Sequence, residues 1–194
     1  MSLWHNHPVI ISGLDECGRG SLAGPLVGAI AIINIPANQF LSLINTPLRD
    51  SKKLSEIQRN KLYSIKDELP ITYFIESISV EDINERGISW ANSQIFINLF
   101  EKLNCDQYLV DGNLKFENNK ALSVIKGDNI HPQIMLASVI AKVYRDSLMT
   151  ELHVDYPEYH WDKNSGYGCQ AHQEAIRKFG PTPHHRTLFI RNFV

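Results

Sequence analysis

Four carboxylates follow apolar segments and stand beside turn residues, and these are the side chains best suited to chemistry. They are Asp15, Glu16, Asp111 and Asp128. Each lies where an apolar strand should end, and strand ends of an α/β sheet are where functional sites assemble. Carboxylates gathered in one groove repel each other and stay ionised only when a cation joins them. Oxygen ligands with few histidines nearby favour Mg²⁺ or Mn²⁺ over zinc.

Asp15 and Glu16 are adjacent, although neighbouring side chains on a regular strand point to opposite faces. Both can reach one site only if the strand breaks there or if Glu16 bends around. Gly18 and Gly20 are placed to supply that break. The same glycines let backbone N–H groups approach an anion or a sugar closely. We therefore interpret residues 15–20 as a pair of metal ligands joined to a substrate cradle.

Two of the acids also have ordinary structural explanations. Asp111 precedes Gly112, and this pair is typical of plain turns. Asp128 could cap the helix that begins near Pro132. Two acids that end a buried strand, as at Asp15, are harder to explain in this way, because buried charge without a partner is costly. The prediction of a metal site depends on all four positions together.

The elements that must position these acids follow from the apolar pattern, which predicts one α/β domain over residues 1–194. Strands are expected over residues 9–14, 26–35, 71–80, 108–111 and 122–126. Helices are expected over residues 55–68, 81–103 with an interruption at Gly87, 132–152 and 171–179. The order of strands and helices favours a mixed central sheet with helical material at the C-terminal end.

The composition excludes several classes of protein. A chain of 194 residues with 43% hydrophobic and 21% charged residues builds one core and is not disordered. The longest apolar run, residues 26–33, is too short to span a membrane, and the first eight residues lack the features of a signal peptide. Three cysteines without paired spacing exclude a disulfide framework and indicate the cytoplasm.

The charge is unevenly distributed, although the net charge is only −2. No acidic residue follows Glu174, whereas several basic ones do: Arg177, Lys178, Arg186 and Arg191, with His184 and His185 between them. A second basic group consists of Arg49, Lys52 and Lys53. We interpret both groups as phosphate contacts, which position a duplex without reading its sequence. The alternative is that they are solvated surface charges.

Six motifs resemble the ribonuclease HII family, and they follow one another in the family's order. The matching segments are 15–20 (DECGRG), 50–55 (DSKKLS), 110–113 (VDGN) with 126–128 (KGD), 137–146 (ASVIAKVYRD), 166–172 (GYGCQAH) and 180–186 (GPTPHHR). They extend from near the start to the last dozen residues, so the resemblance covers essentially the whole chain. One departure is Cys17, which stands where the family has alanine and puts a sulfur beside the metal site.

The resemblance implies a ribonuclease H-like fold, with a C-terminal helical part over about 153–194 that contributes to substrate binding. It implies an endonuclease that hydrolyses the RNA strand of RNA/DNA hybrids. The enzyme would also nick on the 5′ side of ribonucleotides embedded in duplex DNA, leaving 5′-phosphate and 3′-hydroxyl by a two-metal-ion mechanism. The implied catalytic and metal-binding residues are Asp15, Glu16, Asp111 and Asp128. The implied substrate-binding residues are Gly18, Arg19, Gly20, Tyr167, Lys52 and Lys53.

The same resemblance implies cofactors and partners. Two Mg²⁺ or Mn²⁺ ions would bind with the substrate, which is an RNA/DNA hybrid or a DNA duplex with an embedded ribonucleotide. A cytoplasmic monomer that acts in DNA replication and repair is expected. Because the sequence stops soon after Arg186, no tail that docks a sliding clamp is expected. No extra N-terminal substrate-binding domain is expected either, which argues against the sister family, ribonuclease HIII.

Two other functions compete with the nuclease. A non-catalytic, metal-assisted hybrid-binding module would keep the fold but would be expected to lose carboxylates first, and all four are present. A phosphohydrolase acting on a small molecule could use the same acids. The separate basic groups favour an extended polyanion over a small phosphate ester.

Overall fold

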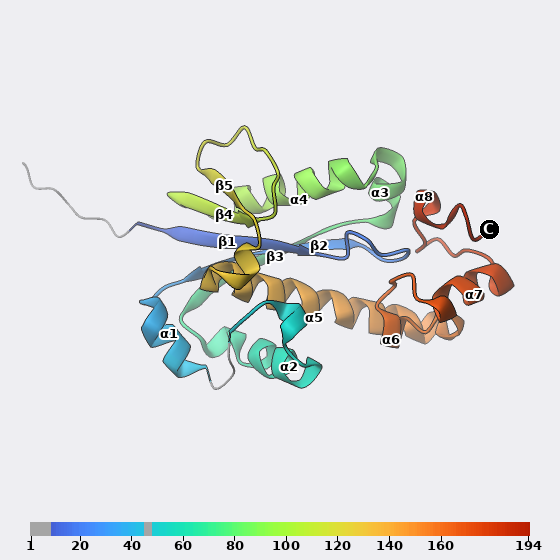
Figure 1. The fold of residues 1–194 in the computed structure, drawn as a ribbon, viewed down its shortest axis with the longest axis horizontal. Helices are drawn as coiled ribbons and strands as arrows, with labels where there is room; N and C mark the ends of the chain where they lie inside the picture. Colours follow the sequence, from blue (N-terminus) through green and yellow to red (C-terminus); the bar gives the residue numbers. More distant parts are fainter. Residues whose placement is uncertain (1–8, 45–47) are drawn as a thin grey trace, which may run out of the picture.

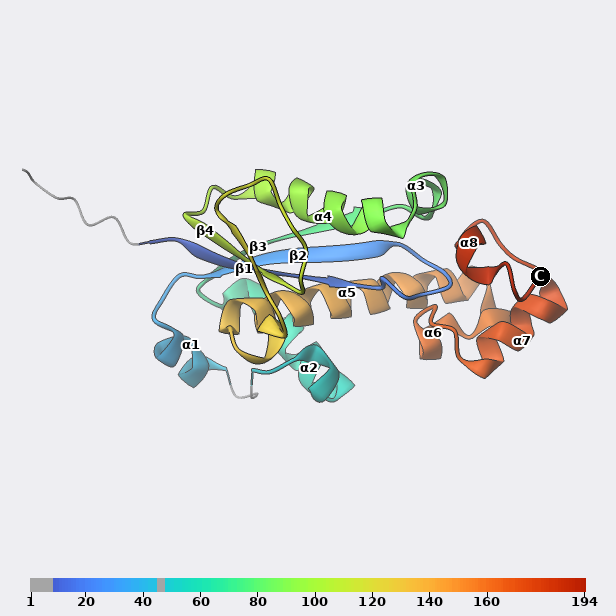
Figure 2. The same cartoon turned by 45° about the horizontal axis from the view of Figure 1, so that its top comes forward.

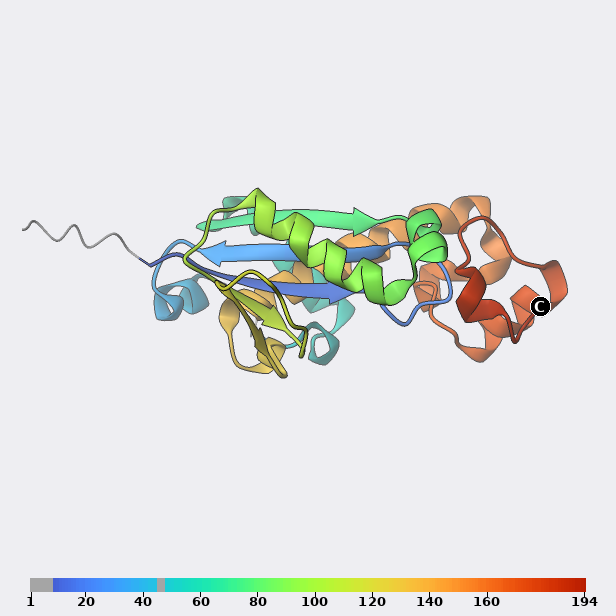
Figure 3. The ribbon, with the colours of Figure 1, turned by 90° about the horizontal axis from the view of Figure 1, so that it is seen from above.

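A five-stranded mixed sheet forms the centre of the computed structural model, which describes residues 9–44 and 48–194. The strand order is β3–β2–β1–β4–β5 (Figure 3). The first three strands form an antiparallel meander, whereas β4 and β5 run parallel to β1. The strands are β1 (Ile11–Cys17), β2 (Leu26–Ile33), β3 (Ile71–Ile78), β4 (Gln107–Asp111) and β5 (Ala121–Val124).

Helices cover both faces of the sheet (Figures 1 and 2). One face carries α3 (Val80–Arg86) and α4 (Ile88–Lys102), and the other carries α1 (Ala37–Leu43), α2 (Glu56–Ser64) and α5 (Pro132–Asp155). Beyond the end of the sheet lie α6 (Trp161–Asn164), α7 (Gln170–Phe179) and α8 (Thr187–Ile190). The short 3₁₀ turns are η1 (Ser51–Lys53), η2 (Lys66–Glu68), η3 (Gly127–Asn129) and η4 (Pro157–Tyr159). No helix in the described ranges is both long and apolar enough to cross a bilayer.

The alternation of side chains on β2 explains the two hydrophobic cores that lie on the two faces of the sheet. Val27 and Ala29 pack in the core beneath α5, whereas Leu26 and Ile30 pack in the core beneath α4. Because β2 is buried on both faces, its sequence is almost continuously apolar. On β1, Gly13 lets the first turn of α5 approach the sheet, since a Cβ there would lie 2.2 Å from the backbone of α5. This contact fixes α5 directly beside the strand that carries the first two acids.

The fold confirms the predicted elements, with three kinds of difference. Two details are confirmed: the helix expected over 81–103 is interrupted at Gly87, and Ser55 begins α2 with a capping box. The first difference is that the strand expected over residues 9–14 continues to Cys17, so it does not break at the acidic pair. The expected continuation of α2 to residue 68 is a separate 3₁₀ turn. The apolar pattern did not predict α1, α6 and α8, which have seven residues or fewer.

Candidate active site

Asp15 and Glu16 lie on opposite faces of β1, near its carboxyl end. The residue paired with Asp15 is Ala29, which belongs to the core beneath α5. The residue paired with Glu16 is Gly28, which faces Ile95 and Leu99 of α4. The interpretation that the strand breaks at this pair is therefore wrong, because regular pleating continues through both residues. The break follows at Gly18, where φ is +95°.

Asp111 and Asp128 approach the same edge of the sheet from two further segments. Asp111 is the last residue of β4, which runs parallel to β1, so the carboxyl ends of the two strands lie side by side. Asp128 lies in η3, and its backbone N–H donates to Asp111 Oδ1 at 3.3 Å. Asp128 does not cap α5, because the N-cap residue of that helix is His131. The structural alternative for Asp128 is thereby removed.

The electrostatics of the four acids are those of a cluster of like charges. Burial raises the pKa of Asp15 well above its ordinary value, and the charges of Glu16 and Asp111 raise it further. Burial also raises the pKa of Glu16, against the opposing effect of Arg19, whose Nη1 lies 3.4 Å from Glu16 Oε1. Burial and the charge of Asp111 raise the pKa of Asp128. Asp111 thus acts on each of the other three acids.

These residues fit a hard divalent cation. In residues 9–44 and 48–194, no three His, Cys, Asp or Glu side chains lie close enough to hold an ion as they stand. The oxygen donors are nevertheless of the type that Mg²⁺ and Mn²⁺ prefer. Burial and neighbouring charges raise the pKa values of Asp15, Glu16 and Asp128, and a cation between the acids would relieve this repulsion.

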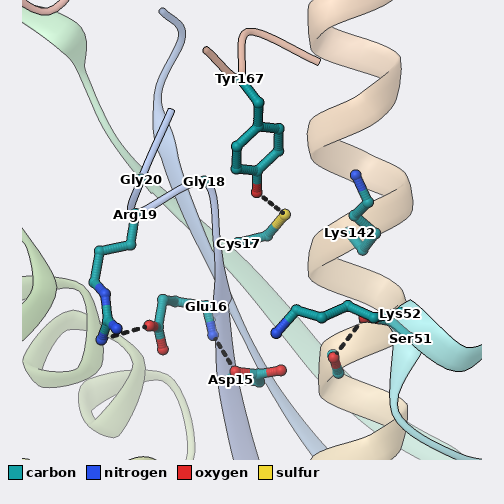
Figure 4. A pocket seen from close by; sticks show the side chains of 11 residues that line it. Asp15, Glu16, Cys17, Gly18, Arg19, Gly20, Ser51, Lys52, Lys142 and Tyr167 are labelled. Atoms are coloured by element: carbon teal, nitrogen blue, oxygen red, sulfur yellow. Dashed lines mark hydrogen bonds and ion pairs between the residues drawn. The ribbon is translucent and has the colours of Figure 1, made fainter. Parts of the chain in front are cut away.

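A pocket of about 390 Å³ adjoins the first two acids (Figure 4). It gathers seven of the ten predicted site residues: Asp15, Glu16, Gly18, Arg19, Gly20, Lys52 and Tyr167. Asp111, Asp128 and Lys53 do not line it. The Lys53 ammonium donates instead to Asn129 Oδ1, one residue from Asp128. The four acids lie at the carboxyl ends of β1 and β4 and in η3. The end of β1 connects them directly to the proposed substrate cradle at residues 18–20.

The loop after β1 contains two glycines with different environments. A Cβ on Gly18 would lie 2.1 Å from Arg145 Nε, and its positive φ also disfavours a side chain. A Cβ on Gly20 would meet no atom of the protein within 4 Å. The fold itself therefore requires glycine at position 18, whereas position 20 leaves space that a ligand can enter.

Tyr167 forms the opposite wall of the pocket (Figure 4). The residue is 38% exposed, and its hydroxyl oxygen lies 3.9 Å from Cys17 Sγ. Burial of the hydroxyl and the nearby Cys17 raise the pKa of Tyr167 to about 12, so the phenol is neutral at physiological pH. Burial likewise raises the pKa of the Cys17 thiol, which disfavours a reactive thiolate at this position.

Several residues near the pocket were missed or misread from the sequence. Ser51, Ser138 and Lys142 line it. Lys142 forms an i, i+4 ion pair with Asp146, at 2.7 Å. Arg145 was not considered, yet it is fully buried and donates to the carbonyl oxygens of Ala23, Pro25 and Ser165. A signal existed, because it lies four residues after Ala141 and four before Met149 on the apolar face of α5.

Two predicted phosphate contacts are corrected by burial. Arg186 is fully buried and donates to backbone carbonyl oxygens of Gly24 and Arg19, so it cannot contact a phosphate at the surface. His185 is 1% exposed and bonds to Thr182 and His172. These residues hold the segments that line the pocket: Arg186 bonds to the backbone after β1, and His185 bonds to His172, which contacts the carbonyl oxygen of Tyr167.

Comparison with solved structures identifies the class of fold. A ribonuclease HII chain from the PCNA:RNase HII complex of Archaeoglobus fulgidus superposes with a TM-score of 0.79 at 22% identity, covering 92% of this chain and 94% of that chain. The structure of Bst-RNase HIII in complex with Mn²⁺ superposes with a TM-score of 0.73 at 15% identity, covering 95% of this chain and 69% of that chain. The protein therefore has the ribonuclease H-like fold.

Sequence comparisons then narrow the class to one family. The family model described as Ribonuclease HII matches residues 12–192. Ribonuclease HII of Clostridium perfringens (strain SM101 / Type A) is 43% identical over 187 residues, which cover 95% of this chain and 68% of the relative. The chain belongs to the ribonuclease HII family, whose members are metal-dependent endoribonucleases of the ribonuclease H type.

Proposed function

We propose that this chain hydrolyses the RNA strand of RNA/DNA hybrids and nicks duplex DNA on the 5′ side of an embedded ribonucleotide, leaving 5′-phosphate and 3′-hydroxyl. The observation that carries the proposal is the continuity between acids and cradle. Asp15 and Glu16 end the same strand whose loop, Gly18 to Gly20, forms one wall of the pocket, and Tyr167 forms the other. A cleavable phosphate and the ribose beside it could therefore occupy adjoining parts of one site.

In this proposal Asp15, Glu16, Asp111 and Asp128 hold two divalent ions, Mg²⁺ or Mn²⁺, in the presence of substrate. Two such metal ions together supply an activated water, stabilise the leaving oxygen and neutralise phosphate charge. The carboxylates position these charges at the sheet edge. Arg19, which pairs with Glu16 in the absence of substrate, is free to turn toward a phosphate because its side chain is 63% exposed.

Recognition of RNA must depend on the ribose 2′-hydroxyl, the group that distinguishes RNA from DNA. We assign it to backbone groups of residues 18–20, which a sugar can approach because Gly20 has no side chain and no protein neighbour. The flat ring of Tyr167 would pack against the same nucleotide. Since Tyr167 lies after α6, the C-terminal helical part contributes directly to substrate binding. The phenol is neutral and can donate a hydrogen bond.

The decisive experiment uses a labelled DNA duplex with one embedded ribonucleotide and an all-DNA duplex as control. Each is incubated with the purified protein in Mg²⁺, in Mn²⁺ and in chelator. We expect one metal-dependent nick on the 5′ side of the ribonucleotide and no cutting of the control. Binding without cleavage under every metal would instead favour the hybrid-binding module. Cutting of the all-DNA duplex would remove the role given to Gly18, Arg19, Gly20 and Tyr167.

Lys52 and Lys53 provide a matched pair for the proposed phosphate contacts. Both are exposed, but only Lys52 lines the pocket, whereas Lys53 already bonds to Asn129. We expect Lys52→Ala to flatten the slope of log affinity against log salt by about one, the effect of one lost phosphate contact. Lys53→Ala should change the slope less. Binding of an uncleaved hybrid, measured in Ca²⁺ over a salt series, checks this; an unchanged slope for Lys52→Ala would make it a solvated surface charge.

A further inference from the structure

A buried chain of hydrogen bonds lies behind Tyr167 and ends at its carbonyl oxygen. His172, in the first turn of α7, is fully buried, and its Nδ1 lies 2.9 Å from the carbonyl oxygen of Tyr167. Its Nε2 lies 3.0 Å from Trp161 Nε1 and 3.2 Å from His185 Nε2. His185 Nδ1 lies 2.9 Å from the backbone nitrogen of Thr182.

The chemistry of these partners fixes the position of every proton in the chain. The indole N–H of Trp161 can only donate, so His172 Nε2 must accept, and His172 Nδ1–H must donate to the carbonyl of Tyr167. The backbone N–H of Thr182 donates to His185 Nδ1, so His185 carries its proton on Nε2, and this N–H shares the single lone pair of His172 Nε2 with the Trp161 N–H. Both rings are neutral in this arrangement, because a second proton on either would remove a required acceptor.

The hydrogen-bond network continues from His185 to the segment that holds the Gly18–Gly20 loop. His185 pairs with Ala23 in an antiparallel bridge. Its neighbour Arg186 donates from Nη1 to the carbonyl oxygen of Arg19 at 3.1 Å. One short segment, residues 184–186, is therefore bonded both to the Gly18–Gly20 loop and, through the two histidines, to Tyr167, which lies beside that loop in Figure 4.

We propose that His172 and His185 are positioning residues that fix Tyr167 relative to the Gly18–Gly20 loop, and that they thereby set the preference for a ribonucleotide over a deoxyribonucleotide. This inference rests on the proposed function, in which Tyr167 and the loop contact the ribose. Neither histidine reaches the pocket itself. Burial lowers the pKa of His172, and burial together with His172 lowers the pKa of His185 to about 4, which keeps both rings neutral under physiological conditions.

Two isosteric variants of His172 separate positioning from simple packing. The amide nitrogen of His172→Asn can take the place of Nδ1 and keep the donor to Tyr167. The amide oxygen of His172→Gln can take the place of Nε2 and keep the acceptor for Trp161 and His185, but it loses the donor to Tyr167. His172→Asn keeps the bond to Tyr167 but loses the bond to His185, so we expect it to lower kcat/KM on the embedded-ribonucleotide duplex by only about threefold. His172→Gln should lose about tenfold or more, because small displacements of a substrate contact have effects up to about 100-fold.

A double-mutant cycle with Tyr167→Ala tests whether the effect passes through Tyr167. If it does, His172→Gln adds little to the loss that Tyr167→Ala already causes. Equal losses in both backgrounds, or a folded His172→Gln protein with wild-type kcat/KM, would overturn the inference. Thermal unfolding of each variant identifies losses that come from misfolding. A wild type that cuts no substrate would refute the proposed function instead, and that outcome is visible before any variant is made.

The tautomers supply a test that needs no variant. In a long-range ¹H–¹⁵N spectrum of the wild-type protein at neutral pH, we expect His172 protonated at Nδ1 and His185 at Nε2. The Nε2–H form of His172 would leave the carbonyl of Tyr167 without its donor and would overturn the inference. This result stands even if the variants do not fold.

Discussion

Asp15→Asn should lower cleavage of the embedded-ribonucleotide substrate by more than about 100-fold, the upper range for loss of a residue that merely supports a metal ligand. The amide keeps the shape of the carboxylate but removes the charge that would hold a divalent ion. Asp15 is 7% exposed, and its charge is opposed by burial and by two neighbouring acids. The metal-free variant should therefore be at least as stable as the wild type.

The pH dependence of this gain has a definite sign. The folded state raises the pKa of Asp15 above its unfolded value of 3.8, so the folded protein binds the proton more tightly. The wild type thus loses stability, relative to Asp15→Asn, as the pH rises through the folded pKa. The advantage of the variant should be present at neutral pH and vanish below about pH 3.8.

Three measurements check this prediction: kcat/KM, the melting temperature over a pH series, and the melting temperature with and without Mn²⁺. Mn²⁺ should stabilise the wild type more than Asp15→Asn. Glu76→Gln is the matched control, because Glu76 is a carboxylate of the same sheet that pairs with Lys102 at 2.6 Å, outside the pocket. It should cut at the wild-type rate. Near-normal turnover in Asp15→Asn would show that the acidic site is assigned wrongly.

Gly18→Ala and Gly20→Ala should give opposite results, although the residues are two positions apart. At Gly18 the new methyl group would collide with the buried Arg145 side chain, and the positive φ of this residue disfavours any side chain. We therefore expect the unfolding free energy to fall by about 3 kcal/mol. At Gly20 the methyl meets no protein atom, so the melting temperature should not change. The Gly20→Ala variant should nevertheless cleave the embedded-ribonucleotide duplex about tenfold or more slowly, because the methyl group occupies the space through which the ribose approaches.

Denaturant unfolding and kcat/KM, measured on both variants, separate the two effects. A stable Gly18→Ala would contradict the close contact with Arg145. Full activity in Gly20→Ala would show that the loop does not receive the sugar, and the ribose would then have to be recognised elsewhere in the pocket.

The sequence was most informative where burial extends over a long segment. The continuous apolar run of β2 and the long apolar pattern of α5 predicted both elements, because a strand or helix packed in the core must be apolar along most of its length. The short α1, α6 and α8 were missed for the opposite reason. Helices of four to seven residues are too short to show a period, and tertiary contacts must stabilise them.

The positions of the acids could be predicted, but their surroundings could not. The types and spacing of Asp15, Glu16, Asp111 and Asp128 pointed to one sheet edge, where the structure places them. Whether β1 continues past Glu16 depends on its pairing with β2, which local sequence does not reveal. Arg186 was misread for a similar reason. Its charge suggested phosphate, whereas its partners are carbonyl oxygens more than 160 positions away.

This separation has a consequence for protein synthesis. The carbonyl oxygens of Gly24 and Arg19 leave the ribosome early, but Arg186, which binds them, is made 162 and 167 residues later. Contacts between such distant positions form late in folding, because a long loop must close first. A growing chain can therefore assemble much of its sheet while the wall of the pocket is still incomplete. The pocket can be complete only after Arg186 has emerged and bonded to these two carbonyl oxygens.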